Sequence, residues 1–137
     1  EFVDKIAAIL GGDASGKRIG VLGLSFKAGT DDVRNSVAVK IIDKLLSLNA
    51  SVISHDPISI PAAKQIRPGY EYALAPSDVG VDADVLVVLT DWPEFNDLDY
   101  AELGRMMKSP RMVDGRNMLN KQQMKDLGFE YVGVGIA

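Results

Sequence analysis

Three cationic residues stand at positions from which they could together bind an anion. Lys27 and Arg34 lie in a polar segment, residues 25–35, and Arg116 follows an Asp-Gly pair much later in the chain. Each is expected just beyond the end of a buried parallel strand, and such strand ends meet at one sheet edge, where helix N-termini also favour negative charge. This spacing favours a phosphate site. Spacing alone leaves an alternative open: the three cations could be solvated loop charges that pair with nearby carboxylates. The carboxylates in question are Asp31, Asp32 and Asp114.

Other residue types offer less chemistry. His55 is the single histidine, and no serine spacing supplies a nucleophile for it, so we expect a structural role at a strand end. One histidine with scattered carboxylates also lacks the spacing of metal ligands, so no metal site is predicted. Trp92 could line a ligand pocket, although packing over the sheet edge is favoured. No residue of this chain is predicted to be catalytic.

The glycines argue against an independent dinucleotide site. Gly20 and Gly23 are not followed by the third glycine of a G-x-G-x-x-G fingerprint. The chain is therefore not expected to bind a dinucleotide by itself.

Composition narrows the class of protein. The 137 residues carry 15 basic and 19 acidic side chains, a net charge of -4, which argues against nonspecific nucleic-acid binding. No apolar run is long enough to span a bilayer, and we find no signal peptide. The absence of cysteine excludes disulfides, thiolate metal sites and a cysteine nucleophile within these residues, and it fits a cytoplasmic protein. Because the chain begins at Glu1 rather than Met, we expect a piece of something longer.

Hydrophobic periodicity gives the expected elements. Strands are predicted at residues 19–24, 51–55, 83–90, 111–114 and 129–134, and helices at residues 1–10, 36–49, 98–107 and 121–127. The pattern between 58 and 81 is weaker and indicates a short helix (60–66), a short strand (71–73) and a loop or single helical turn (76–81). Alternating strands and helices without hairpin signals predict an α/β fold, a three-layer Rossmann-like open parallel sheet with helices on both faces.

The first residues are expected to lie outside that domain. Phe2, Ile6 and Leu10 share one helical face, and Gly11-Gly12 supplies a helix stop. We therefore interpret residues 1–14 as the end of a preceding helix and a linker, and residues 15–137 as one domain.

Residues 23–36 carry a family resemblance. They closely resemble the signature G-L-x-F-K-x-x-T-D-D-x-R-x-S, which opens the C-terminal nucleotide-sugar-binding domain of the UDP-glucose/GDP-mannose dehydrogenases. The likeness continues through residues 55–57, 83–84, 90–95 and 113–117 and covers roughly residues 3–134. One departure is Asn35, where the family commonly carries a glutamate.

The resemblance implies a function for the longer protein. These enzymes oxidise the C6 alcohol of a nucleotide sugar to a carboxylate in two NAD-dependent steps, through a thioester on a cysteine. An N-terminal domain holds NAD, a central helical region forms a homodimer, and the C-terminal domain closes over the nucleotide sugar. Transferred by motif, Phe26 (through its backbone), Lys27 and Arg116 would bind the nucleotide sugar, Arg34 would reach NAD, and Asp31 and Asp32 would orient the loop.

The resemblance leaves the sugar open, because UDP-glucose, UDP-N-acetylmannosamine and GDP-mannose relatives share these motifs. UDP-glucose is the favoured substrate. Lacking the catalytic cysteine, this chain alone is expected to be inactive. The alternative is a stand-alone nucleotide-binding regulatory module without catalysis.

Overall fold

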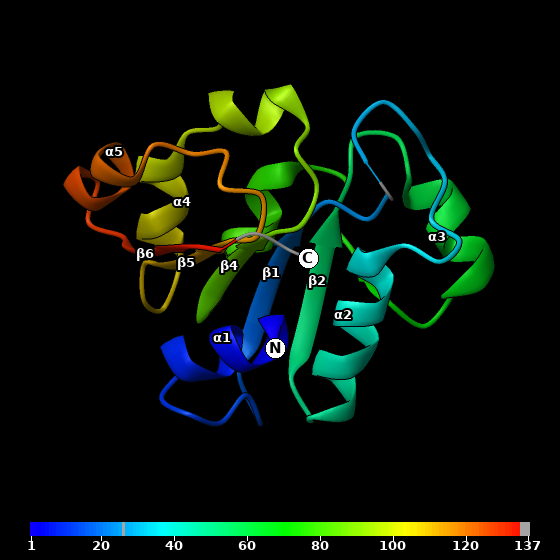
Figure 1. The fold of residues 1–137 in the computed structure, drawn as a ribbon, viewed down its shortest axis with the longest axis horizontal. Coiled ribbons are helices and arrows are strands. Elements are labelled where there is room, and N and C mark those ends of the chain that lie inside the picture. Colours follow the sequence, from blue (N-terminus) through cyan, green and yellow to red (C-terminus); the bar gives the residue numbers. More distant parts are fainter. Residues whose placement is uncertain (26, 135–137) are drawn as a thin grey trace.

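The structure, a computed structural model, describes residues 1–25 and 27–134. Within them, six strands form one parallel sheet in the order β3-β2-β1-β4-β5-β6 (Figure 1). This is the strand order of doubly wound Rossmann folds. The strands are β1 (Arg18–Leu22), β2 (Ser51–His55), β3 (Glu71–Tyr72), β4 (Val85–Val88), β5 (Arg111–Asp114) and β6 (Glu130–Gly133).

Helices cover both faces of the sheet, which confirms the predicted three-layer architecture. One face carries α1 (Phe2–Ile9), α2 (Val37–Ser47) and α3 (Ile60–Ile66), and the other carries α4 (Tyr100–Met106), α5 (Lys121–Asp126) and the 3-10 turns η1 (Pro76–Gly80) and η2 (Pro93–Asp97). Alternate residues of each central strand serve the two cores: Val21 and Val87 pack under α1–α3, and Leu22 and Leu86 pack under the other layer. Both faces being covered explains the near-continuous apolar runs of β1 and β4.

Several boundaries differ from the prediction. Strand β1 ends at Leu22 rather than residue 24 because Gly23 takes a φ of +110° and turns the chain. Helix α2 is shorter than residues 36–49, since the Ser36 side chain caps it by accepting the Ala38 N–H. The region predicted as one helix from residue 98 begins two residues later, after a cap at Asp99, and η2 precedes it unpredicted.

Helix α1 is part of the packed structure. Ile6 and Leu10 are buried in the same core as α2. In the part of the chain that the structure describes, no helix combines the length and apolarity needed to cross a membrane.

Candidate functional site

The strand order creates a topological switch point at the carboxyl end of the sheet. Strand β1 lies between β2 and β4, so the order in which the strands join the parallel sheet reverses between β1 and β4. The register pairs Leu22 with Val88 and Val88 with Asp114, so β1, β4 and β5 end level with one another. In open α/β sheets, ligands bind outside the carboxyl ends of the strands at this switch point. The loops after β1, β4 and β5 therefore border the candidate site.

Two of these loops touch directly. A Cβ built on Gly23 would lie 2.3 Å from Thr90 Oγ1 and 2.6 Å from Thr90 N, so only glycine fits this approach. The Thr90 hydroxyl in turn donates a 3.2 Å hydrogen bond to the Ser25 carbonyl. The loops after β1 (residues 23–36) and β4 (residues 89–92) are therefore joined, and we call them together the rim of the site.

Lys27 and Arg34 both belong to the long loop after β1. Lys27 is exposed, and its carbonyl oxygen accepts a 3.0 Å hydrogen bond from the Ser25 hydroxyl. Arg34 is exposed too, with Nε 3.4 Å from Asp32 Oδ1. Asn35 next to it has a φ of +56°, a conformation that asparagine tolerates better than glutamate. The loop therefore presents two accessible cations.

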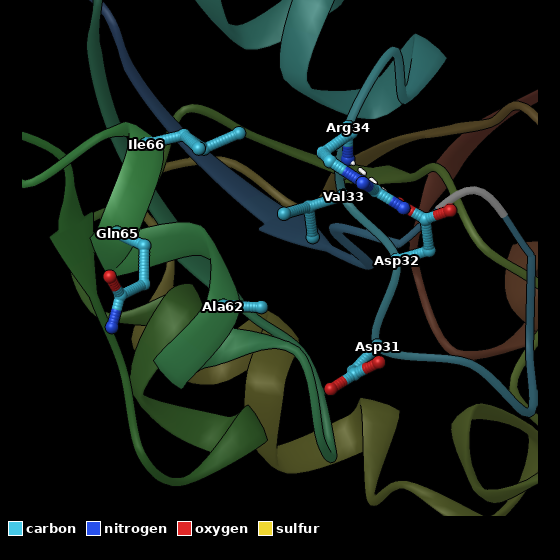
Figure 2. A pocket seen from close by; sticks show the side chains of 7 residues that line it. All are labelled: Asp31, Asp32, Val33, Arg34, Ala62, Gln65 and Ile66. Carbon is cyan, nitrogen blue, oxygen red and sulfur yellow. Dashed lines mark hydrogen bonds and ion pairs between the residues drawn. The ribbon is translucent and has the colours of Figure 1, made fainter.

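Arg34 also borders a cavity of about 360 Å³ between this loop and α3 (Figure 2). Figure 2 shows Val33 and Ile66 facing one another across it, with the Arg34 side chain directed along the loop toward Asp32. The wall is made by Asp31, Asp32, Val33, Arg34, Ala62, Gln65 and Ile66. Neither Lys27 nor Arg116 lines this cavity, so Arg34 occupies the α3 side of the rim, separate from the other two cations.

Arg116 projects from a rigid turn after β5. The fully buried Asp114 carboxylate accepts backbone N–H groups from Arg116 (3.0 Å), Met118 (3.0 Å) and Leu119 (2.9 Å) and the Tyr131 hydroxyl (2.7 Å). Burial raises the pKa of the Tyr131 phenol, and the hydrogen bond to Asp114 raises it further. The hydroxyl therefore stays protonated and can donate. The turn fixes the backbone from which Arg116 extends.

The Arg116 side chain reaches toward the loop after β4. Its Nη2 lies 3.3 Å from Asp91 Oδ2, and both side chains are partly exposed. The alternative of loop cations paired with carboxylates thus describes Arg34 with Asp32 and Arg116 with Asp91. Asp114, one of the carboxylates expected as partners, is instead occupied by backbone N–H groups and the Tyr131 hydroxyl. Sequence reasoning missed Asp91 as a partner because it is 25 residues away along the chain.

All three cations leave the same edge of the sheet, Lys27 and Arg34 after β1 and Arg116 after β5. Within the described residues, Lys27 makes no ion pair, while those of Arg34 and Arg116 are partly exposed and weak. Phe26, the fourth predicted contact, lies outside the described residues. The edge therefore presents positive groups from two loops that are far apart in sequence.

His55 and Trp92 have structural surroundings. His55 is buried, its Nδ1 lies 2.8 Å from the Ala73 carbonyl oxygen, and its ring meets that of Phe95 edge-on. Trp92 is buried as well, and its Nε1–H donates to the Asp56 carboxylate over 3.1 Å. Among residues 1–25 and 27–134, no three His, Asp or Glu side chains gather as metal ligands would.

Known proteins resemble this chain along nearly its whole length. A UDP-glucose 6-dehydrogenase of Rickettsia conorii is 44% identical over 136 residues, covering 98% of this chain and 32% of the relative. One from Rhizobium meliloti is 39% identical over 131 residues, 96% of this chain and 30% of the relative. The chain thus spans about a third of the length of the curated relatives it matches.

Solved structures show the same fold. A UDP-glucose dehydrogenase from Pyrobaculum islandicum superposes with a TM-score of 0.79 at 29% identity, covering 99% of this chain and 29% of that one. An NDP-N-acetyl-D-galactosaminuronic acid dehydrogenase from Methanosarcina mazei gives a TM-score of 0.82 at 27% identity, covering 98% and 28%. Residues 20–121 match the model of the UDP binding domain of the UDP-glucose/GDP-mannose dehydrogenase family, and the chain therefore belongs to that family.

Proposed function

We propose that this chain is the C-terminal, nucleotide-sugar-binding part of a longer UDP-glucose 6-dehydrogenase, which oxidises the sugar C6 alcohol to a carboxylate with two NAD. The observation that carries the proposal is the joined rim at the switch point, where cations from the family motif and from the Asp-Gly-Arg turn leave one sheet edge. Relatives named UDP-glucose 6-dehydrogenase at up to 44% identity support the choice of sugar.

Each cation has a proposed role. Lys27 supplies a mobile point charge to the diphosphate, and Arg116, held from a rigid turn, grips its phosphate or ribose end through a fixed fork of donors. The backbone of Phe26 contacts the same ligand. Arg34, on the α3 side of the rim, reaches across to NAD.

NAD itself is proposed to bind mainly in another part of the longer protein. A Rossmann site for NAD needs a glycine fingerprint after β1 and a free carboxylate near the end of β2 to accept the ribose hydroxyls. The fingerprint is missing, and both oxygens of Asp56, directly after β2, already accept hydrogen bonds within the chain. These residues therefore do not fit NAD as its principal site.

The remaining features of the longer protein follow the family. We propose that residues 15–137 are the nucleotide-sugar domain and that residues 1–14 continue from a preceding helix. A central region would form the homodimer, and a cysteine outside this chain would carry the thioester, which leaves these residues inactive alone. The enzyme would be cytoplasmic and supply uronate units for polysaccharide biosynthesis.

The stoichiometry of the longer protein tests the reaction. UDP-glucose with NAD should yield about two NADH per sugar oxidised to a carboxylate; a ratio of one would contradict the four-electron oxidation.

The affinity for UDP-glucose tests the site. Lys27→Ala should lose a charge-assisted contact of about 1.5 to 3 kcal/mol, weakening UDP-glucose by roughly 10- to 150-fold. Lys108→Ala, an exposed lysine next to the opposite, amino end of β5, is the matched control. Equal affinities for the two variants would remove Lys27 from the site.

A further inference from the structure

The Asp56 carboxylate collects hydrogen bonds from several loops. Its Oδ1 accepts the N–H groups of Ile58 (3.0 Å) and Ser59 (2.8 Å). Its Oδ2 accepts those of Leu24 (2.9 Å) and Ser25 (3.3 Å) and the indole N–H of Trp92 (3.1 Å). Asp56 is 2% exposed, so the protein supplies these donors in place of water.

These donors belong to three different loops. Leu24 and Ser25 follow β1, Ile58 and Ser59 follow β2, and Trp92 follows β4. The loops after β1 and β4 lie on the two sides of the switch point, so one carboxylate fixes both of them.

The connection to Lys27 is short. The Ser25 hydroxyl lies 3.0 Å from the Lys27 carbonyl oxygen and 3.4 Å from Asp56 Oδ2, and its single proton goes to the nearer acceptor. The Ser25 N–H is held by Asp56, and its carbonyl accepts from Thr90. Ser25, two residues before Lys27, is therefore anchored through every one of its polar groups.

We propose that Asp56 is a positioning residue of the nucleotide site: its carboxylate sets the loop that carries Lys27 and locks it to the loop after β4. This inference rests on the proposed function. Asp56 does not touch the ligand, since five N–H donors fill the roughly four acceptor positions of a carboxylate. It acts through the geometry of Ser25 and Trp92.

The charge of Asp56 is maintained in this buried place. Burial by itself would raise the pKa of the carboxyl, but the N–H groups of Leu24, Ile58 and Ser59 stabilise the anion more strongly, and its pKa is lowered overall. The carboxylate is thus ionised, and accepts all its donors, at neutral pH. An amide at this position would replace one acceptor by a donor facing other donors.

The test compares two carboxylate-to-amide variants of the 137-residue chain. Asp56→Asn should weaken UDP binding, followed by two-dimensional NMR titration, at least about tenfold, because small displacements of binding groups have large effects. Asp43→Asn is the matched control, since Asp43, in α2, accepts hydrogen bonds from Arg67 and Tyr70, which follow α3. Its UDP affinity should stay within about twofold of the wild type.

A double-mutant cycle separates positioning from mere loss of stability. Lys27→Ala should weaken UDP binding strongly in the wild-type background and hardly at all beside Asp56→Asn, since a misplaced lysine has little left to lose. Additive penalties would overturn the inference. Trp92→Phe removes one donor to Asp56 together with part of a buried ring, and it supplies the same comparison if Asp56→Asn does not fold, with an expected loss of about two- to fivefold.

The single tryptophan provides a spectroscopic signature. Its indole N–H resonance should lie downfield in the wild type and move upfield in Asp56→Asn, as the hydrogen bond to the carboxylate is lost. Failures of the two proposals are distinguishable. UDP that binds neither the 137-residue chain nor the longer protein refutes the proposed function, and this inference with it; if UDP binds only the longer protein, the same variants are compared there. UDP that binds the wild type and Asp56→Asn equally refutes this inference alone.

Discussion

Gly23→Ala should separate the two loops that form the rim. The new methyl group would stand 2.3 Å from Thr90 Oγ1 and 2.6 Å from Thr90 N. Because backbone cannot move aside as a flexible side chain does, we expect an overpacking cost of about 1 to 3 kcal/mol. The φ of +110° adds about 1 to 2 kcal/mol for a residue with a Cβ. The variant should therefore lose roughly 2 to 5 kcal/mol of unfolding free energy, a large part of the ~5 to 15 kcal/mol typical of a domain.

Comparison with Gly29→Ala isolates the steric part of that loss. Gly29 lies in the same loop with a φ of +86°, and a Cβ there would meet nothing within 4 Å. It should lose only the conformational ~1 to 2 kcal/mol. Urea unfolding followed by the fluorescence of the single tryptophan gives both values by linear extrapolation. A Gly23→Ala loss no larger than that of Gly29→Ala would refute the close approach between the loops after β1 and β4.

Three further predictions concern charge and packing. Asp91→Asn should change the unfolding free energy by under about 1 kcal/mol, because the ion pair with Arg116 is partly exposed. It should also strengthen the binding of inorganic diphosphate at Arg116 about threefold, measured by calorimetry, because it removes a repulsion between like charges of ~0.6 kcal/mol at roughly 7 Å in water. The hydrogen bond from Arg67 lowers the pKa of Asp43, so its stabilisation is present above the carboxyl's unfolded value near 3.9 and is lost as pH falls; the stability gap between wild type and Asp43→Asn should shrink from pH 7 to about pH 2. Phe95→Ala, fully buried, should cost about 3 to 5 kcal/mol by the same urea assay.

The sequence predicted the layers of the fold well because both faces of the sheet are covered. Burial on both sides makes β1 and β4 apolar at nearly every position, a signal that periodicity detects directly. The ends of elements depend on single conformations instead. The turn at Gly23 and the cap at Ser36 each shift a boundary, and η2 begins at Pro93, where the proline signal equally fits a loop.

The site was predictable only as far as local motifs reach. The motif of residues 23–36 predicted Lys27 and Arg34 as site residues, and the Asp-Gly-Arg turn predicted Arg116. The contacts that organise them join loops 25 to 36 residues apart, as between Asp91 and Arg116 or Asp56 and Trp92, and hydrophobic periodicity carries no information on such pairs. The sequence did contain a signal for the role of Asp56, because an aspartate directly after a strand can accept the N–H groups of the next turn.

The acidic residues at the carboxyl end of the sheet divide into two kinds, and the division reconciles a net charge of -4 with an anion site. Asp56 and Asp114 stand at strand ends, are buried, and have their charge met by inward-pointing N–H donors. A carboxylate surrounded by such dipoles shapes the edge without presenting its own oxygen atoms to a ligand there. The exposed or partly exposed cations beside them are open to solvent, where a diphosphate can replace weak surface partners such as Asp32 and Asp91. Overall charge thus argues against nonspecific nucleic-acid binding, whereas affinity for one anion depends on which carboxylates are already satisfied inside the protein.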